Sequence, residues 1–141
     1  MTAAERRTLE ILARQLAVVR LPAGAALPAW FGQATGPMAS MTRTADETSL
    51  ICDAAVVPPN AHAERGWRAM KVRGPLAFSL TGVLAGILVP LAAARISVFA
   101  LSTYDTDYIL VRTADLPAAI NALRPTYDIR AQGQDDGIIV S

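Results

Sequence analysis

Cysteine and histidine are scarce in this 141-residue chain, where Cys52 and His62 are the single members of their kinds. One cysteine cannot form an internal disulfide, and no cluster of the two residue types indicates a zinc site. Basic residues hardly exceed acidic ones, at 13 against 12, and they form no stripe that would hold a phosphate backbone. We therefore expect no metal, no other cofactor and no nucleic-acid partner.

A charge-free run of 21 residues, 74–94, reaches the length of a membrane span. Pro75 and Pro90 near its ends argue against insertion, and its large apolar residues recur at the spacing of a helix that packs on a sheet. The N-terminus is charged and lacks the apolar core of a secretory signal. These features predict a cytoplasmic protein without a membrane partner.

Apolar residues make up 52% of the chain, which is ample for a packed interior, and their pattern predicts two similar halves. In the first half we expect strands at 8–12, 15–21, 38–43 and 49–57 and a short helix within 27–31. The capping-box spacing of Thr2 and Glu5 leaves a helix open for 8–12, but a strand hairpin into 15–21 is favoured.

The second half repeats the order strand, helix, strand, turn, strand, and adds a further helix and strand. Ser79 is expected to cap a long helix that ends near Ala94, with Pro90 as a kink or early stop. The remaining elements are expected at 67–72, 97–102, 108–112, 116–123 (a helix), 128–132 and 137–140.

Thr44–Cys52 aligns without a gap over Thr103–Val111, which indicates an internal duplication. The element order predicts an α+β fold of two ferredoxin-like βαββαβ units, with antiparallel sheets and helices on one face. We expect an incomplete N-terminal half at 1–63 and a complete C-terminal domain at 64–141.

Asp105 and Asp107 flank a turn and allow two interpretations, a pair for acid–base chemistry or a solvated turn in which Asp bonds its own backbone. No histidine, cysteine or lysine nearby completes a catalytic set, so we predict no catalytic residue and no enzyme. The junction at 77–79 offers helix N–H groups to an α-carboxylate, and Asp107 is suited to an α-ammonium. Together they would suit a zwitterion.

The motifs GPLAFSLTGVL at 74–84 and ISVFALSTYDTDYILV at 96–111, together with Gly66-Trp67-Arg68, resemble the ACT-domain family of the CASTOR type. This family includes eukaryotic cytosolic arginine sensors and short bacterial proteins. The resemblance is strong from Gly66 to Leu123 and weaker in the first half. It implies a regulatory sensor whose tandem ACT units bind a small ligand, typically an amino acid, at an interface between units.

The resemblance also implies which residues bind the ligand. A Ser-Val pair of the sensors matches Ser97 and Val98, and their Thr-aromatic pair and hairpin Asp match Thr103, Tyr104 and Asp107. A Gly and a Glu around the helix start align with Ala77 and Leu80. The ligand-binding residues predicted are Ala77, Phe78, Ser79, Leu80, Ser97, Val98, Thr103, Tyr104 and Asp107.

Leu80 replaces the Glu that would hold a guanidinium, so a neutral or apolar amino acid is expected at least as much as arginine. The long sensors carry four ACT units and this chain two. A homodimer would supply the missing pair and set Ser97 and Val98 of one subunit opposite the 103–107 hairpin of the other. The alternative is a structural or protein-interaction ACT module without a ligand, which the apolar Ala77 and Leu80 favour.

Overall fold

The computed structural model describes residues 6–33 and 36–133. The chain divides into two compact units, which are described separately. Of the described residues, unit 1 contains 6–13 and 68–133, and unit 2 contains 14–33 and 36–67. The first half of strand β5 (Ala63–Val72) belongs to unit 2 and the second half to unit 1.

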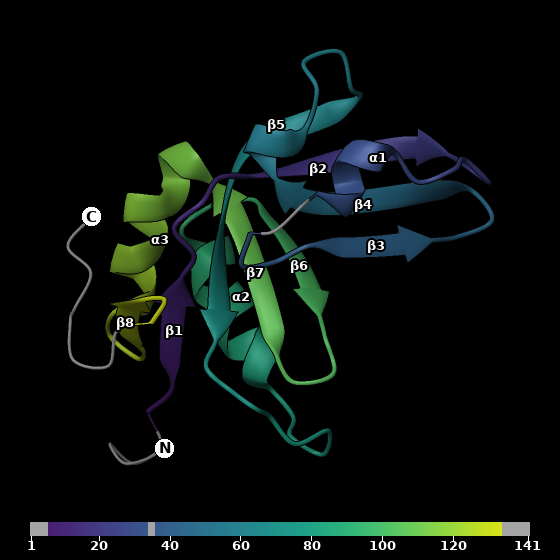
Figure 1. Cartoon of the computed structure of the whole chain (residues 1–141). Helices are drawn as coiled ribbons and strands as arrows, with labels where there is room; N and C mark the ends of the chain where they lie inside the picture. Colours follow the sequence, from purple (N-terminus) through teal and green to yellow (C-terminus); the bar gives the residue numbers. More distant parts are fainter. Residues whose placement is uncertain (1–5, 34–35, 134–141) are drawn as a thin grey trace. The chain divides into compact units, whose positions relative to one another are not determined.

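Unit 1 is a mixed sheet with strand order β6-β7-β5-β1-β8 and two main helices (Figure 1). Strands β1 and β8 are parallel, whereas the pairs β1–β5 and β6–β7 are antiparallel, so one parallel pair interrupts the expected antiparallel pattern. The elements besides β5 are β1 (Thr8–Ile11), α2 (Val83–Ala93), β6 (Val98–Ser102), β7 (Asp107–Arg112), η3 (Thr113–Asp115), α3 (Leu116–Leu123) and β8 (Asp128–Ala131).

Helix α3 has the bounds that its sequence predicts, because its buried residues recur at helical spacing. Pro117 lies in the first turn, where its missing N–H costs nothing. The helices pack on the sheet face that carries Leu9, Ile11 and the other core residues of this unit. The other members of this core are Met70, Val72, Ile87, Leu91, Ile96, Ile109, Val111, Leu116, Ala119, Ile120, Leu123, Tyr127 and Ile129.

Two sequence predictions about unit 1 are wrong. Helix α2 begins at Val83 rather than after Ser79, because the left-handed Gly82 (φ 77°) sits at its N-cap position and no side chain caps it. Strand β1 forms no hairpin with β2 (Leu16–Pro22) but pairs with β5 and β8, so residues 6–13 lie in unit 1 and not in the N-terminal half. Its buried Leu9 and Ile11 explain that pairing, since both join the core of unit 1.

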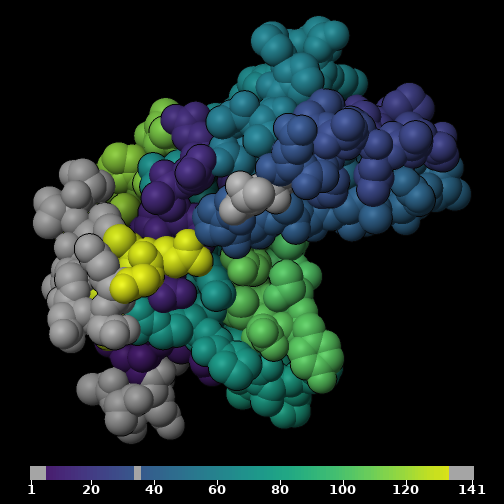
Figure 2. All heavy atoms as spheres, viewed as in Figure 1, coloured from purple at the N-terminus to yellow at the C-terminus, as the bar shows by residue number. Residues whose placement is uncertain are grey.

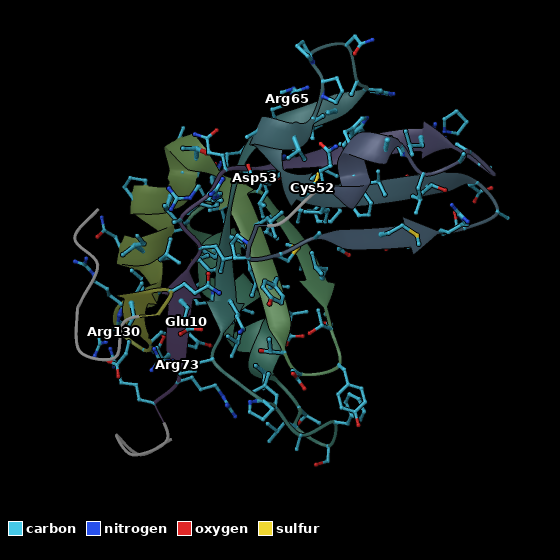
Figure 3. The ribbon with its side chains drawn as sticks, in the orientation of Figure 1. Glu10, Cys52, Asp53, Arg65, Arg73 and Arg130 are labelled. Carbon is cyan, nitrogen blue, oxygen red and sulfur yellow. The ribbon has the colours of Figure 1, made fainter. Side chains whose placement is uncertain are left out.

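Unit 2 is an antiparallel sheet in the order β3-β4-β2-β5. Its further elements are β2, α1 (Ala29–Gly32), β3 (Ser40–Arg43), β4 (Glu47–Asp53) and η2 (Ala54–Val56). At the end of β4, the Asp53 carboxylate accepts hydrogen bonds from the Ala55 N–H at 3.0 Å and from Arg14 Nη1 at 2.8 Å (Figure 3).

The expected strand at 137–140 lies outside the described residues. Within residues 6–33 and 36–133, no helix combines the length and apolarity that a membrane crossing requires.

Cys52 lies in the core of unit 2 with no exposed surface. Burial raises the pKa of its thiol, and the neighbouring Asp53 carboxylate raises that pKa further. Because the thiolate is the reactive form, we expect iodoacetamide at pH 8 to alkylate native Cys52 about 100-fold or more slowly than the urea-unfolded chain. Mass spectrometry of timed samples measures both rates. A native rate close to the unfolded rate would contradict this burial.

Candidate functional site

A tight turn between β6 and β7 forms one side of the candidate site. Thr103 closes this turn: its backbone N–H donates to the Thr106 carbonyl at 2.8 Å, and its hydroxyl donates to the same oxygen at 3.2 Å. The Thr106 N–H in turn lies 3.3 Å from Thr103 Oγ1. These bonds fix the orientation of the residues between them, Tyr104 and Asp105.

Thr106 joins the turn to the centre of the sheet. Its side chain is buried, and its hydroxyl donates to the carbonyl of Val72 at the end of β5. A buried hydroxyl needs such a partner, because leaving it unpaired costs about 1–3 kcal/mol. The turn therefore has a fixed position relative to β5.

The loop from Arg73 to Gly82 forms the other side of the site and is anchored where it begins. The Arg73 N–H donates to the Thr8 carbonyl at 2.9 Å, and its guanidinium pairs with the largely buried Glu10 carboxylate at 3.1 Å (Figure 3). Farther along, the Leu76 N–H donates to the Asp105 carbonyl at 2.7 Å, which ties loop and turn together. In Figure 2 the teal atoms of the loop lie against the green atoms of the hairpin.

Between loop and turn lies a cavity of about 230 Å³, called the hairpin pocket below. A cavity of this size fits a molecule of amino-acid size and is below the usual range for drug-sized ligands, about 300–1,000 Å³. It is lined by Leu76, Ala77, Phe78, Leu80, Val83, Ser102, Thr103, Tyr104, Asp105, Thr106 and Asp107.

Two aromatic rings form an exposed wall of the hairpin pocket. Phe78 is 76% exposed and Tyr104 is 79% exposed, and their ring centroids lie 4.8 Å apart in an edge-to-face arrangement. Single exposed apolar side chains are ordinary on a protein surface, but an exposed apolar patch beside a cavity is typical of a binding site. The pair offers an apolar surface to a ligand or a partner.

The charged side chains that line the hairpin pocket, Asp105 and Asp107, are both acidic. The Asp107 carboxylate accepts a hydrogen bond from the Ser102 hydroxyl across the β6–β7 pair, which orients it. Val83, the first residue of α2, brings the uncapped N-terminus of that helix to the pocket lining. The pocket thus combines negative charge, apolar surface and helix N–H groups.

The structure brings together Ala77, Phe78, Leu80, Thr103, Tyr104 and Asp107 of the predicted ligand-binding residues. Ser79 lies exposed on the loop outside the lining. Val98 begins β6, with Ser97 directly before it, at the end opposite the pocket: Val98 pairs with Val111 and Ser102 with Asp107, roughly 13 Å apart along the strand. Within one chain these two residues do not reach the pocket.

The sequence prediction missed some lining residues, of which Leu76 and Thr106 matter most. Leu76 carries no local signal, because its role is a backbone bond to the turn. Thr106 stood between the two conspicuous aspartates in the motif. Among residues 6–33 and 36–133, no group of three or more acidic, histidine or cysteine side chains is placed to hold a metal ion.

Comparison with known proteins gives matches over most of the chain. Residues 62–125 match a family model described as the ACT domain. The cytosolic arginine sensor for mTORC1 subunit 1 of Bos taurus is 35% identical over 101 residues, which cover 64% of this chain and 31% of the bovine protein. The human sensor of the same name is 34% identical over the same length. The aligned part therefore spans about a third of these relatives.

Solved structures match a larger part of the chain. A crystal structure of a protein from Agobacterium tumefaciens is 33% identical, with a TM-score of 0.82, and the match covers 94% of this chain and 98% of that one. An aspartate kinase of Clostridium acetobutylicum, described as an allosteric enzyme, has a TM-score of 0.64 at 11% identity, over 84% of this chain and 34% of the kinase. The second likeness is one of fold alone.

Gly74 allows the loop to approach the turn closely. A Cβ at this position would lie 3.0 Å from the Asp105 carbonyl oxygen and 3.3 Å from the Thr106 Cβ. We expect Gly74→Ala to lower the free energy of unfolding by about 1–2 kcal/mol, because the anchored turn must shift. Urea titration measures the change.

Gly32 provides the matched control, since a Cβ there meets nothing within 4 Å. Gly32→Ala is expected to be neutral or to stabilise the chain by up to about 1 kcal/mol. Equal effects of the two substitutions would show that the close approach at Gly74 is unimportant.

Proposed function

The chain belongs to the ACT-domain family, and from this membership we propose that it is a regulatory protein that binds an amino acid in the hairpin pocket. Both the family and the α+β ferredoxin-like fold predicted from the sequence are confirmed by the family match and the Agobacterium structure. The observation that supports the proposal best is the pocket itself, which gathers most of the residues that the resemblance singled out. The relatives that are named as arginine sensors support the same class of ligand.

Each part of an amino acid has a suitable partner in the pocket. The α-ammonium binds the Asp107 carboxylate by a charge-assisted hydrogen bond. The α-carboxylate approaches the N–H groups at the start of α2, where the helix dipole favours negative charge. An apolar side chain then packs on Leu80 and Phe78, which line the same cavity.

Leu80 governs which amino acid is preferred in this proposal. It is 44% exposed and lines the pocket at the position where the resemblance implies a Glu. Without that carboxylate a guanidinium has one acidic partner fewer. The preferred ligand is therefore neutral or apolar rather than arginine.

We further propose a cytoplasmic homodimer as the functional form. Ser97 and Val98 lie at the start of β6, too far from the β6–β7 turn to reach the hairpin pocket of their own chain. A twofold-related copy would place them opposite the pocket of the other subunit, and bound ligand would then stabilise that arrangement. Regulation in this scheme is a population shift and involves no catalytic step.

A second candidate function is a protein-interaction module without a small ligand. The exposed pair of Phe78 and Tyr104 favours it, because aromatic side chains are common anchors of protein interfaces. In that case the pocket would receive a side chain of a partner protein and no free amino acid.

Thermal unfolding in the presence of each standard amino acid distinguishes these functions. A ligand at 100 times its Kd stabilises the folded state by about 2.7 kcal/mol, which raises the Tm by several degrees. We expect at least one neutral amino acid to do so, and Asp107→Asn to abolish the shift by removing the ammonium's partner.

Asp46→Asn is the matched control, because Asp46 occupies the corresponding hairpin of unit 2, at an exposed position. It should leave the shift intact. A flat response to every amino acid would favour the interaction module, and loss of the shift in both variants would argue against a role specific to Asp107.

Leu80→Glu tests the basis of selectivity. A carboxylate at this lining position restores a partner for a guanidinium, so the affinity for arginine should rise by about tenfold or more relative to leucine. Isothermal titration calorimetry measures both affinities, and Leu80→Gln controls for polarity without charge. An unchanged preference would show that Leu80 does not contact the ligand side chain.

A further inference from the structure

Unit 1 contains a second cavity that shares no lining residue with the hairpin pocket. This cavity, called the α3 cavity below, has a volume of about 350 Å³. It lies where α3 meets the ends of β1 and β8, elements that are adjacent in Figure 1. Nothing in the proposed function uses it.

The wall of the α3 cavity is aliphatic. Leu116 and Ile120 of α3 and Ile11 of β1 are all buried and line it, together with the small side chain of Ala131. No aromatic ring and no acidic side chain is among its lining residues, all of which belong to the described part of the chain. Such a wall favours an alkyl group, at about 0.8 kcal/mol for each CH₂ removed from water.

Arg68 gives this apolar cavity a single positive charge. Its Nε and Nη2 both donate to the Leu12 carbonyl, at 3.1 and 2.8 Å, which holds the guanidinium in one orientation at the cavity. A guanidinium carries five N–H donors and matches the geometry of a carboxylate. The amide of Gln132 lines the same cavity and adds a neutral donor.

We propose that the α3 cavity is a second ligand site that binds a small aliphatic monocarboxylate. The carboxylate pairs with Arg68, and the alkyl chain lies against Ile11, Leu116 and Ile120. A free amino acid is disfavoured here, because none of the described residues that line the cavity is acidic and could receive its α-ammonium. The two sites thus differ in charge: acidic groups line the hairpin pocket and a cation lines the α3 cavity.

Isothermal titration calorimetry of the full chain with hexanoate, 1-hexanol and hexylamine tests this site. The three probes share an alkyl chain and differ in charge. Hexanoate is expected to bind at least about tenfold more tightly than 1-hexanol, and hexylamine more weakly than either, because Arg68 attracts the first and repels the last. Equal binding of hexanoate and 1-hexanol, or no binding of hexanoate up to 10 mM, would overturn the proposal.

Arg68→Gln should weaken hexanoate binding about tenfold or more while leaving 1-hexanol within about threefold. Arg95→Gln removes the same charge from an exposed position outside the cavity and should change neither affinity. Because Arg68 also holds the Leu12 carbonyl, Ala131→Leu is the second variant: it fills the cavity, keeps Arg68, and should abolish binding of both probes. Retained hexanoate binding in Ala131→Leu would contradict the assignment.

Asp107→Asn separates this site from the hairpin pocket. Hexanoate affinity should be the same in that variant, since Asp107 is not among the residues of the α3 cavity. A lost or strengthened response would place hexanoate in the hairpin pocket and overturn the proposal. The outcome does not depend on whether any amino acid binds the protein, so the two proposals can fail separately.

Discussion

The buried hydroxyl of Thr106 holds the β6–β7 turn to the carbonyl of Val72, and the whole hairpin pocket depends on that anchor. Once the turn is fixed, the Asp105 carbonyl is in place to accept the Leu76 N–H, and the loop that follows Arg73 closes over the cavity. Each bond contributes only about 1 kcal/mol, but together they join segments that are distant in sequence. The binding groups are thereby oriented before any ligand arrives.

The corresponding hairpin of unit 2 has the same turn but a different residue at the position of Thr106. Thr44 closes its turn in the same way: its N–H donates to the Glu47 carbonyl at 2.9 Å, and its hydroxyl accepts from the Glu47 N–H at 3.2 Å. The repeated bonding agrees with the internal duplication that the sequence indicates. Glu47, however, occupies the position that aligns with Thr106, and the helix of this unit, α1, is only four residues long. The same turn in the two units therefore has different surroundings.

The sequence predicted what is determined by local pattern. Helix α3 has the predicted bounds because Leu116, Ile120 and Leu123 recur at helical spacing, and the hairpin strands follow from alternation around their turns. The predicted start of α2 after Ser79 was wrong. Serine is a common capping residue type, but the helix begins at Val83, directly after Gly82 at the N-cap position. The pairing of β1 depends on partners that are distant in sequence and carries no local signal.

The residues of the candidate site likewise fall into two groups, those that the sequence could predict and those that it could not. Its motif residues were predictable from family resemblance, whereas the roles of Leu76 and Thr106 are long-range bonds that no spacing reveals. The α3 cavity was not foreseen, because its walls come from separate segments that only the folded unit brings together.

A crystal structure of the protein with the amino acid that stabilises it most tests the central claim directly. The account predicts ligand density in the hairpin pocket, with the α-ammonium within hydrogen-bond distance of the Asp107 carboxylate and the side chain against Phe78 and Leu80. An empty hairpin pocket, with the amino acid bound elsewhere, would contradict it.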